Sequence, residues 1–285
     1  MLAAGLHVAR TRALRTTAAG RSRMAALFLL AVSGLVSQVG GIVPTAPSVG
    51  CVYERRSSTT NGSAVSASIL VGNITRTYWL YVPSREDINA SRPLPLVLNF
   101  HGWKSDGQWQ MTNTNGNAIA NESGFIHVYP DGMDDNPTPD GTGWRSWNAG
   151  GSSLSPGPAG PICDGDHSGD GLCYSSCARR AGGCDAQGCD WTSCVDDLGF
   201  VEMLLDHLEE TLCVDRNRVY ATGFSNGAML VYNLGMSLSR RFAAIAPVEG
   251  GIHPGFLVQP DVPVSLLDIH GTQDLTVPIN GTDGM

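Results

Sequence analysis

Several short, continuous apolar runs constrain the fold more than any other feature of this sequence. They stand at residues 94–100 (LPLVLNF), 124–130 (GFIHVYP), 218–224 (RVYATGF), 242–248 (FAAIAPV) and 262–270 (VPVSLLDIH). Runs of this length and composition are typical of strands that are buried on both faces. Two more segments, 67–72 and 76–83, are predicted to pair as strands joined around Gly72 and Asn73.

The clearest helix is predicted at residues 195–213. Its apolar side chains fall on one face, namely Val201, Leu204, Leu205, Leu208 and Leu212. Asp196 and Asp197 stand in the first turn, where acidic groups suit the helix dipole. Strands that alternate with helices in a glycine-rich chain predict an α/β fold with a mostly parallel central sheet and helices on both faces.

Residues 150–194 break this alternation, because they are rich in Gly, Ser and Cys and show little periodicity. We interpret them as an inserted loop held by its own crosslinks. The eight cysteines are Cys51, Cys163, Cys173, Cys177, Cys184, Cys189, Cys194 and Cys213. Their even number favours disulfides in an oxidising compartment, with the pairing left open. A zinc site is the weaker alternative, since no Cys-x-x-Cys pair occurs.

An acidic turn within the insert has some features of a calcium loop. Residues 164–171 (DGDHSGDG) place oxygen side chains at Asp164, Asp166, Ser168 and Asp170. The twelfth position of such a loop is Ser175 instead of Glu, and no helices flank the segment. We therefore prefer a solvated turn to a metal site.

The N-terminus has the pattern of a secretory signal. A short apolar run from Met24 follows Arg21 and Arg23, and small residues lie around Ser37–Gly41. Residues 1–41 are accordingly predicted to be a signal peptide with a basic upstream extension, Met24 being an alternative start. An organelle transit peptide and a membrane anchor are the alternatives, although the run is short for a membrane span. Residues 42–65 are predicted to form a linker and residues 66–285 the folded domain.

Charge and modification motifs restrict the class of partner. Removing the five arginines of residues 1–50 leaves 13 Lys+Arg against 26 Asp+Glu, so the charge moves from −8 to −13. An acidic domain argues against a nucleic-acid partner. Glycosylation triplets begin at Asn61, Asn73, Asn89, Asn121 and Asn280. With the cysteines they favour an extracellular protein, without stable membrane insertion once the signal is cleaved; the oligomeric state is left open.

The segment Gly223-Phe-Ser-Asn-Gly227 fits the pattern G-x-S-x-G. It follows a predicted strand and precedes a predicted helix, as a nucleophile elbow requires. The glycines relieve crowding, so that Ser225 can adopt a strained backbone and project its hydroxyl. Oxyanion donors are expected at the N–H of Asn226 and near Trp103, in the loop after the strand at 94–100. A tight turn with an incidental serine is the alternative that the neighbouring motifs disfavour.

Eight segments occur in an order that resembles one group of enzymes. They are RTYWLYVP, LVLNFHGW, GFIHVYPDG, SWNAG, VDDLGF, RVYATGFSNGAM, FAAIAPVEG and IHGTQDLTVP, between about residues 75 and 278. The chain resembles secreted α/β-hydrolases of the feruloyl esterase and polyhydroxybutyrate depolymerase type. The resemblance implies Ser225 as nucleophile, Asp274 as triad acid, no cofactor, and an ester substrate, often on a cell-wall polysaccharide or a polyester. The long insert departs from the family, and we leave open whether it shapes substrate entry or decorates the surface.

The second departure concerns the base. The triad of this fold runs Ser, Asp, His, yet all seven histidines precede Asp274. His253 is the one we expect near the site, whereas His101 and His270 are expected to shape loops. The preferred interpretation is a C-terminally truncated hydrolase domain, with little or no esterase activity in this polypeptide. The alternative is a non-catalytic secreted binding protein that presents the disulfide-rich insert, which the intact elbow disfavours.

Overall fold

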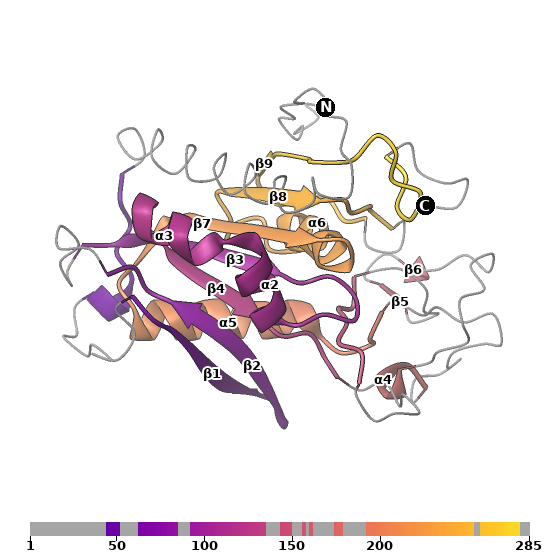
Figure 1. Ribbon diagram of the computed structural model, residues 1–285, viewed down its shortest axis with the longest axis horizontal. Coiled ribbons are helices and arrows are strands. Elements are labelled where there is room, and N and C mark those ends of the chain that lie inside the picture. Colours follow the sequence, from indigo (N-terminus) through magenta and orange to yellow (C-terminus); the bar gives the residue numbers. More distant parts are fainter. Residues whose placement is uncertain are drawn as a thin grey trace.

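A computed structural model describes residues 44–51, 62–84, 92–134, 143–149, 156–157, 160–161, 174–178, 192–253 and 257–279. Its main sheet has the strand order β1-β2-β4-β3-β7-β8-β9 (Figure 1). The strands are β1 (Ala64–Val71), β2 (Ile74–Tyr81), β3 (Leu94–Phe100), β4 (Ile126–Pro130), β7 (Val214–Phe224), β8 (Ala244–Val248) and β9 (Ser265–Leu266). The β1–β2 and β2–β4 pairs are antiparallel, and the pairs from β4 through β9 are parallel.

The central strands are buried on both faces, as the apolar runs predicted. All seven residues of β3 are buried, and its side chains divide between two hydrophobic clusters. Leu96, Leu98 and Phe100 pack on one side of the sheet, while Val97 packs on the other. The predicted hairpin is also confirmed: β1 and β2 join at Gly72, whose φ of 61° is easily adopted by glycine.

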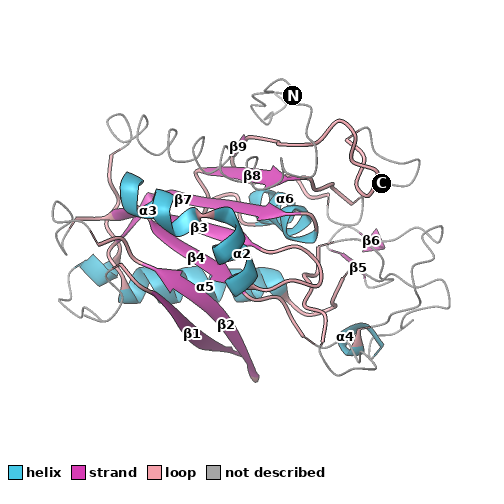
Figure 2. Cartoon of the chain, in the orientation of Figure 1, coloured by secondary structure: helices cyan, strands magenta, loops and turns pink. Residues whose placement is uncertain are grey.

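Helices cover both faces of this sheet (Figure 2). The helices are α2 (Gly107–Thr114), α3 (Gly116–Ser123), α4 (Ser175–Ala178), α5 (Asp197–Thr211), α6 (Asn226–Ser237) and the 3-10 turn η2 (Val49–Cys51). Side chains of α5 and α6 share one cluster with Leu96 and Leu98, and α3 contributes to the cluster on the opposite face. The prediction of a mostly parallel sheet between helices is thus confirmed.

Helix α5 matches the predicted segment, with Val201, Leu204, Leu205 and Leu208 fully buried. Asp196 caps it, because its carboxylate accepts the N–H of Gly199 at 2.8 Å. Asp197 has a further role that the dipole argument did not predict. It is buried and forms an ion pair with Arg76 of β2, which fixes the start of the helix against the sheet.

The predicted strand at 262–270 is wrong in its extent. Only Ser265–Leu266 forms β9, followed by an isolated bridge between Ile269 and Val248. Pro247 of β8 accounts for the break, because it has no N–H to donate to this neighbour. Hydrogen bonds resume on either side of the gap, from Leu267 N–H to the carbonyl of Ile245 and from Ile269 N–H to the carbonyl of Pro247.

Residues 44–51, which we assigned to a linker, lie against the domain. The bridge between Pro47 and Asp215 and the disulfide Cys51–Cys213 hold them to the start of β7. A crosslink that closes a loop of this size stabilises the fold by about 5 kcal/mol in the chain-entropy model. Strand β1 begins at Ala64, two residues before the domain start that we set.

The insert is described in part. A two-residue pair, β5 (Pro156–Gly157) and β6 (Gly160–Pro161), precedes α4. The disulfide Cys177–Cys194 lies within the insert and confirms an internal crosslink. The signal segment 1–41 and the calcium candidates Asp164, Asp166, Ser168 and Asp170 lie outside the described residues. Among the described helices, none is long and apolar enough to cross a membrane.

Candidate active site

Ser225 stands on a sharp turn between β7 and α6. Its backbone angles are φ 54° and ψ −120°, a combination that costs a non-glycine residue on the order of 1–3 kcal/mol. The surrounding structure imposes this conformation. The Ser225 N–H donates to the carbonyl of Val248 at 3.0 Å, and its own carbonyl accepts the N–H of Met229 in the first turn of α6.

The two glycines of the G-x-S-x-G pattern are required by close backbone packing. A Cβ at Gly227 would lie 2.4 Å from the carbonyl oxygen of His101 and 2.5 Å from that of Phe100. A Cβ at Gly223 would lie 2.7 Å from the carbonyl oxygen of Gly227. Real Cβ atoms do not approach backbone this closely, so the turn can form only with glycine at both positions.

The loop after β3 lies beside the serine. A Cβ built on Gly102 would stand 3.5 Å from the Cβ of Ser225. Within the loop, Lys104 N–H donates to the carbonyl of Arg145 and Ser105 N–H donates to the carbonyl of Gly102. The loop that contains Trp103 therefore lies beside the serine, and Asn226 follows the serine at the N-terminus of α6, where backbone N–H groups attract negative charge.

A third segment, residues 146–147, joins these two. The N–H of Trp147 donates to Asn226 Oδ1 at 2.9 Å, and Asn226 Nδ2 donates back to the carbonyl of Trp147 at 3.3 Å. The indole Nε1 of Trp147 donates to the carbonyl of His101 at 2.9 Å. Trp147 is fully buried and packs edge-on against Phe100. The backbone and the indole of one residue, Trp147, thus link the start of α6 to the loop after β3.

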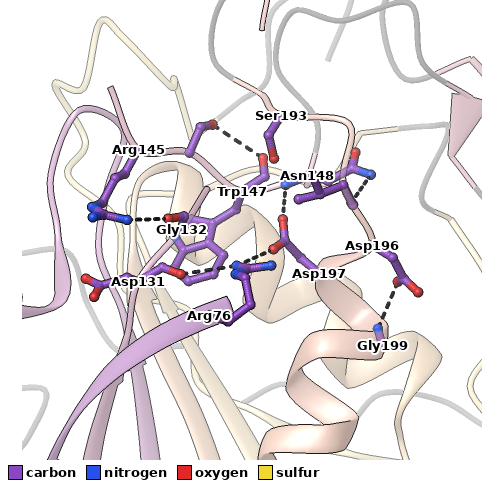
Figure 3. Close-up of polar contacts among 12 residues, drawn as sticks. Arg76, Asp131, Gly132, Arg145, Trp147, Asn148, Ser193, Asp196, Asp197 and Gly199 are labelled. Atoms are coloured by element: carbon purple, nitrogen blue, oxygen red, sulfur yellow. Dashed lines mark hydrogen bonds and ion pairs between the residues drawn. The ribbon is translucent and has the colours of Figure 1, made fainter. Parts of the chain in front are cut away.

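A buried ion pair contacts the chain directly after this segment, at Asn148 (Figure 3). Arg76 Nη2 lies 2.7 Å from Asp197 Oδ1, with the two side chains 4% and 0% exposed. Asp197 Oδ2 accepts the N–H of Asn148 at 2.7 Å, and Arg76 also donates to the carbonyl of Asp131. The guanidinium stacks over Phe200 at 3.9 Å. Burial raises the pKa of Asp197, and the adjacent Arg76 acts against that rise.

His101 has the loop-shaping role that the sequence predicted. Its Nε2 accepts the N–H of Gly132 at 2.9 Å, and its Nδ1 lies 2.7 Å from the carbonyl of Gly102. This pattern assigns the proton to Nδ1. Burial lowers the pKa of His101 to about 4. The imidazole is therefore neutral near neutral pH and is fully engaged by backbone groups.

Asp274 follows the bridge at Ile269, at the edge of the sheet where β3, β7 and β8 end. Its Oδ1 accepts the N–H groups of Thr276 at 2.8 Å and Val277 at 3.0 Å. Its Oδ2 lies 3.5 Å from His270 Nε2, which also contacts the carbonyl of Val277. The carboxylate thus organises the turn that follows it, together with His270.

Three further histidines lie in the described part of the chain, in a loop, a strand and a helix. His253 follows β8 and is 5% exposed. His127 is buried in β4 against Tyr129, and burial lowers its pKa to about 3. His207 is half-buried on α5. No group of three His, Cys, Asp or Glu side chains with metal-binding geometry occurs within the described part of the chain.

Aromatic side chains surround the predicted oxyanion loop. Trp103 and Trp144 meet edge-to-face with ring centroids 5.4 Å apart, and Lys104 Nζ lies 4.0 Å and 3.4 Å from their centroids. Tyr174, from the insert, also reaches Trp103. Sequence reasoning missed Tyr174, Arg76 and Trp147, because their partners are far away in the sequence. The motif SWNAG within the resemblance was the available signal for Trp147.

No family model matches the chain, but curated relatives do. It is 27% identical over 195 residues to the bifunctional acetylxylan esterase/xylanase XynS20E of Neocallimastix patriciarum, covering 68% of this chain and 21% of that protein. It is 29% identical over 202 residues to feruloyl esterase C of Emericella nidulans, covering 66% and 71%. The predicted resemblance to feruloyl esterase-type proteins is confirmed.

Other proteins are also similar to the chain. The chain is 27% identical to the putative esterase NocK of Nocardia uniformis subsp. tsuyamanensis, covering 84% of this chain and 58% of that protein. Among solved structures, a thermostable esterase matches with a TM-score of 0.49 at 19% identity, covering 76% and 49%. The chain spans 21%, 33% and 32% of the length of the first three curated relatives that it matches.

Proposed function

We propose that this protein is a secreted serine hydrolase of carboxylic esters that works through an acyl-enzyme. The observation that carries the proposal is the backbone of Ser225, held at φ 54° and ψ −120° between β7 and α6. A serine that is incidental to a turn does not require such strain. The enclosing glycines and the adjacent loop at Gly102 provide the setting in which a serine hydroxyl acts as a nucleophile.

In the proposed reaction the Ser225 hydroxyl attacks the ester carbonyl carbon. Its proton passes to a histidine base, which then protonates the departing alcohol. The backbone N–H groups of Trp103 and Asn226 stabilise the oxyanion, and water afterwards releases the acid from the serine. Asp274 is the proposed acid that orients the base. Its Oδ1 accepts the N–H groups of Thr276 and Val277, which fix the orientation of the carboxylate.

Relatives support the class of substrate. Two of them are a feruloyl esterase and an acetylxylan esterase, so we propose an aromatic or acetyl ester carried by a polysaccharide. No cofactor is required by this chemistry. The disulfides Cys51–Cys213 and Cys177–Cys194 support the proposal of an extracellular location.

The test is hydrolysis of p-nitrophenyl acetate by the purified polypeptide, with and without imidazole as a base in solution. Ser225→Ala is the matched control, since it removes the nucleophile and leaves the background reaction of imidazole. We expect little hydrolysis without imidazole, and with imidazole a rate for the natural chain well above that of Ser225→Ala. Methyl ferulate and acetylated xylan, assayed in the same way, then identify the acyl group.

Two other outcomes are informative. Hydrolysis that depends on Ser225 without imidazole and is lost in His253→Ala would assign the base to His253. Equal rates for the natural chain and Ser225→Ala in both conditions would contradict the proposal. That result would favour the alternative of a non-catalytic binding protein that presents the disulfide-rich insert.

A further inference from the structure

The insert has a structured base that lies against the domain. We define this base as residues 174–178 and 192–194. Tyr174, Cys177 and Cys194 form a small buried cluster with exposures of 0%, 1% and 3%. The disulfide Cys177–Cys194 joins the two segments of this base, and Cys194 N–H donates to Ser176 Oγ at 2.9 Å. The base is therefore a packed unit.

A second set of contacts ties this base to the segment beneath the serine. Thr192 Oγ1 donates to the carbonyl of Trp147 at 2.8 Å and accepts the N–H of Ala149 at 3.3 Å. Trp147 in turn holds Asn226 and the carbonyl of His101. The insert thus contacts the same segment that joins α6 to the loop after β3.

The phenol of Tyr174 makes the most direct connection. Its hydroxyl donates to the carbonyl of Trp144 at 2.6 Å and accepts the indole N–H of Trp103 at 2.9 Å. These two bonds use the single proton of the hydroxyl and one of its lone pairs. Three separate segments meet at this oxygen: the insert, the loop after β3, and residues 143–149.

We propose that Tyr174 is a positioning residue for the oxyanion loop, through which the base of the insert sets the orientation of the Trp103 peptide. This inference rests on the proposed function, in which the Trp103 N–H stabilises the oxyanion. Trp103 is adjacent to Gly102, which packs against Ser225, so the Tyr174 hydroxyl anchors the side chain of a residue whose peptide lies beside the nucleophile. The insert therefore acts on the chemistry of the site and is more than a surface decoration.

The variant that tests this is Tyr174→Phe, which keeps the buried ring and removes only the hydroxyl. Tyr81→Phe is the matched control, a buried tyrosine of β2 that pairs with His127 at the opposite end of the sheet. Loss of an entire oxyanion donor lowers kcat by about 100- to 1000-fold, and we expect a loosened donor to lower the Ser225-dependent rate by about tenfold.

Two readouts separate positioning from a loss of folded protein. The first is the inhibition constant of phenylboronic acid, which forms a tetrahedral adduct with an activated serine. It should rise by about the same factor of ten in Tyr174→Phe, whereas a smaller folded fraction leaves it unchanged. The second is the indole N–H resonance of Trp103, assigned with Trp103→Phe, which should shift in Tyr174→Phe and stay in place in Tyr81→Phe.

Each result decides a different step. An unshifted Trp103 resonance in Tyr174→Phe would overturn the contact itself. A shifted resonance with unchanged rate and inhibition constant would overturn the positioning role. A natural chain without any Ser225-dependent reaction would remove the proposed function and the positioning role with it, while the resonance would still report whether the insert is docked on Trp103.

Discussion

The two halves of the candidate site are held in different ways. The nucleophile half, comprising Ser225, Asn226, residues 101–106 and residues 146–148, is joined by contacts between segments far apart in the sequence. In the acid corner, residues 267–277, the carboxylate of Asp274 contacts residues 270, 276 and 277, which are its neighbours in the sequence. Leu275 beside it is 93% exposed.

This difference has a physical cause. The nucleophile half must sustain a strained backbone at Ser225, and only a packed and crosslinked surrounding can hold such a conformation. The acid corner holds the carboxylate of Asp274 through the hydrogen bonds of a local turn. We therefore expect substitutions in the nucleophile half to affect the whole fold, whereas those in the acid corner stay local.

The largest expected loss of stability comes from removing the buried charge of Asp197, which supports the nucleophile half. Asp197→Asn leaves the Arg76 guanidinium buried without a compensating charge, which should lower the free energy of unfolding by about 4 kcal/mol. The matched variant Asp274→Asn should lower it by about 1 kcal/mol, because its lost contacts are local hydrogen bonds. Urea denaturation followed by tryptophan fluorescence measures both. Equal losses for the two variants would contradict the proposed difference between the halves.

The next prediction compares the stability of two glycine variants, one in each half. Gly227→Ala forces a Cβ against the carbonyl oxygens of His101 and Phe100, which should cost about 3 kcal/mol, as in other overpacked sites. Gly271→Ala in the acid corner meets nothing closer than Glu249 Oε1 at 3.3 Å, the end of a flexible side chain. Its melting temperature should stay within a few degrees of that of the natural chain. A large drop for Gly271→Ala would show that the acid corner is as tightly held as the elbow.

Acid should weaken the central sheet by a smaller amount. An unfolded histidine has a pKa near 6.5, whereas burial lowers the pKa of His127 to about 3. Between these values only the unfolded chain binds the proton, so stability is full above pH 6.5 and falls as the pH drops. At pH 4.5 this histidine alone should remove about 2.5 kcal/mol.

The matched variant for this prediction is His127→Gln, which keeps a hydrogen-bonding group and has no titrating proton. Its free energy of unfolding should fall less than that of the natural chain between pH 7.5 and 4.5, by about the amount assigned to the histidine. Parallel losses in the two proteins would mean that His127 does not stay neutral in the fold.

The features that the sequence predicted correctly are those that depend on local or periodic patterns of residues. The fully apolar segment of β3, the face of α5 and the strand–turn–helix setting of Ser225 all follow from patterns within about 20 residues. The strand at 262–270 was overestimated, because its interruption originates in Pro247 of a neighbouring strand. The pair Arg76–Asp197 could not be predicted, since its members are 121 positions apart and nothing local distinguishes them from surface charges. The role of Tyr174 could not be predicted either, because it lies in a segment without periodicity and its partners Trp103 and Trp144 lie outside the insert.

The place of β3 in the sheet also determines the order in which this protein can be assembled. β3 pairs with β4, which follows soon after it, but also with β7, where Leu94 meets Val214. A ribosome must therefore synthesise the whole cysteine-rich insert before the middle of the sheet can close. Until then the hydrogen-bonding edge of β3 that pairs with β7 stays open to other chains, and folds dominated by such distant pairings form slowly. Efficient production of this protein should accordingly depend on conditions that prevent aggregation of the chain before β7 has paired with β3.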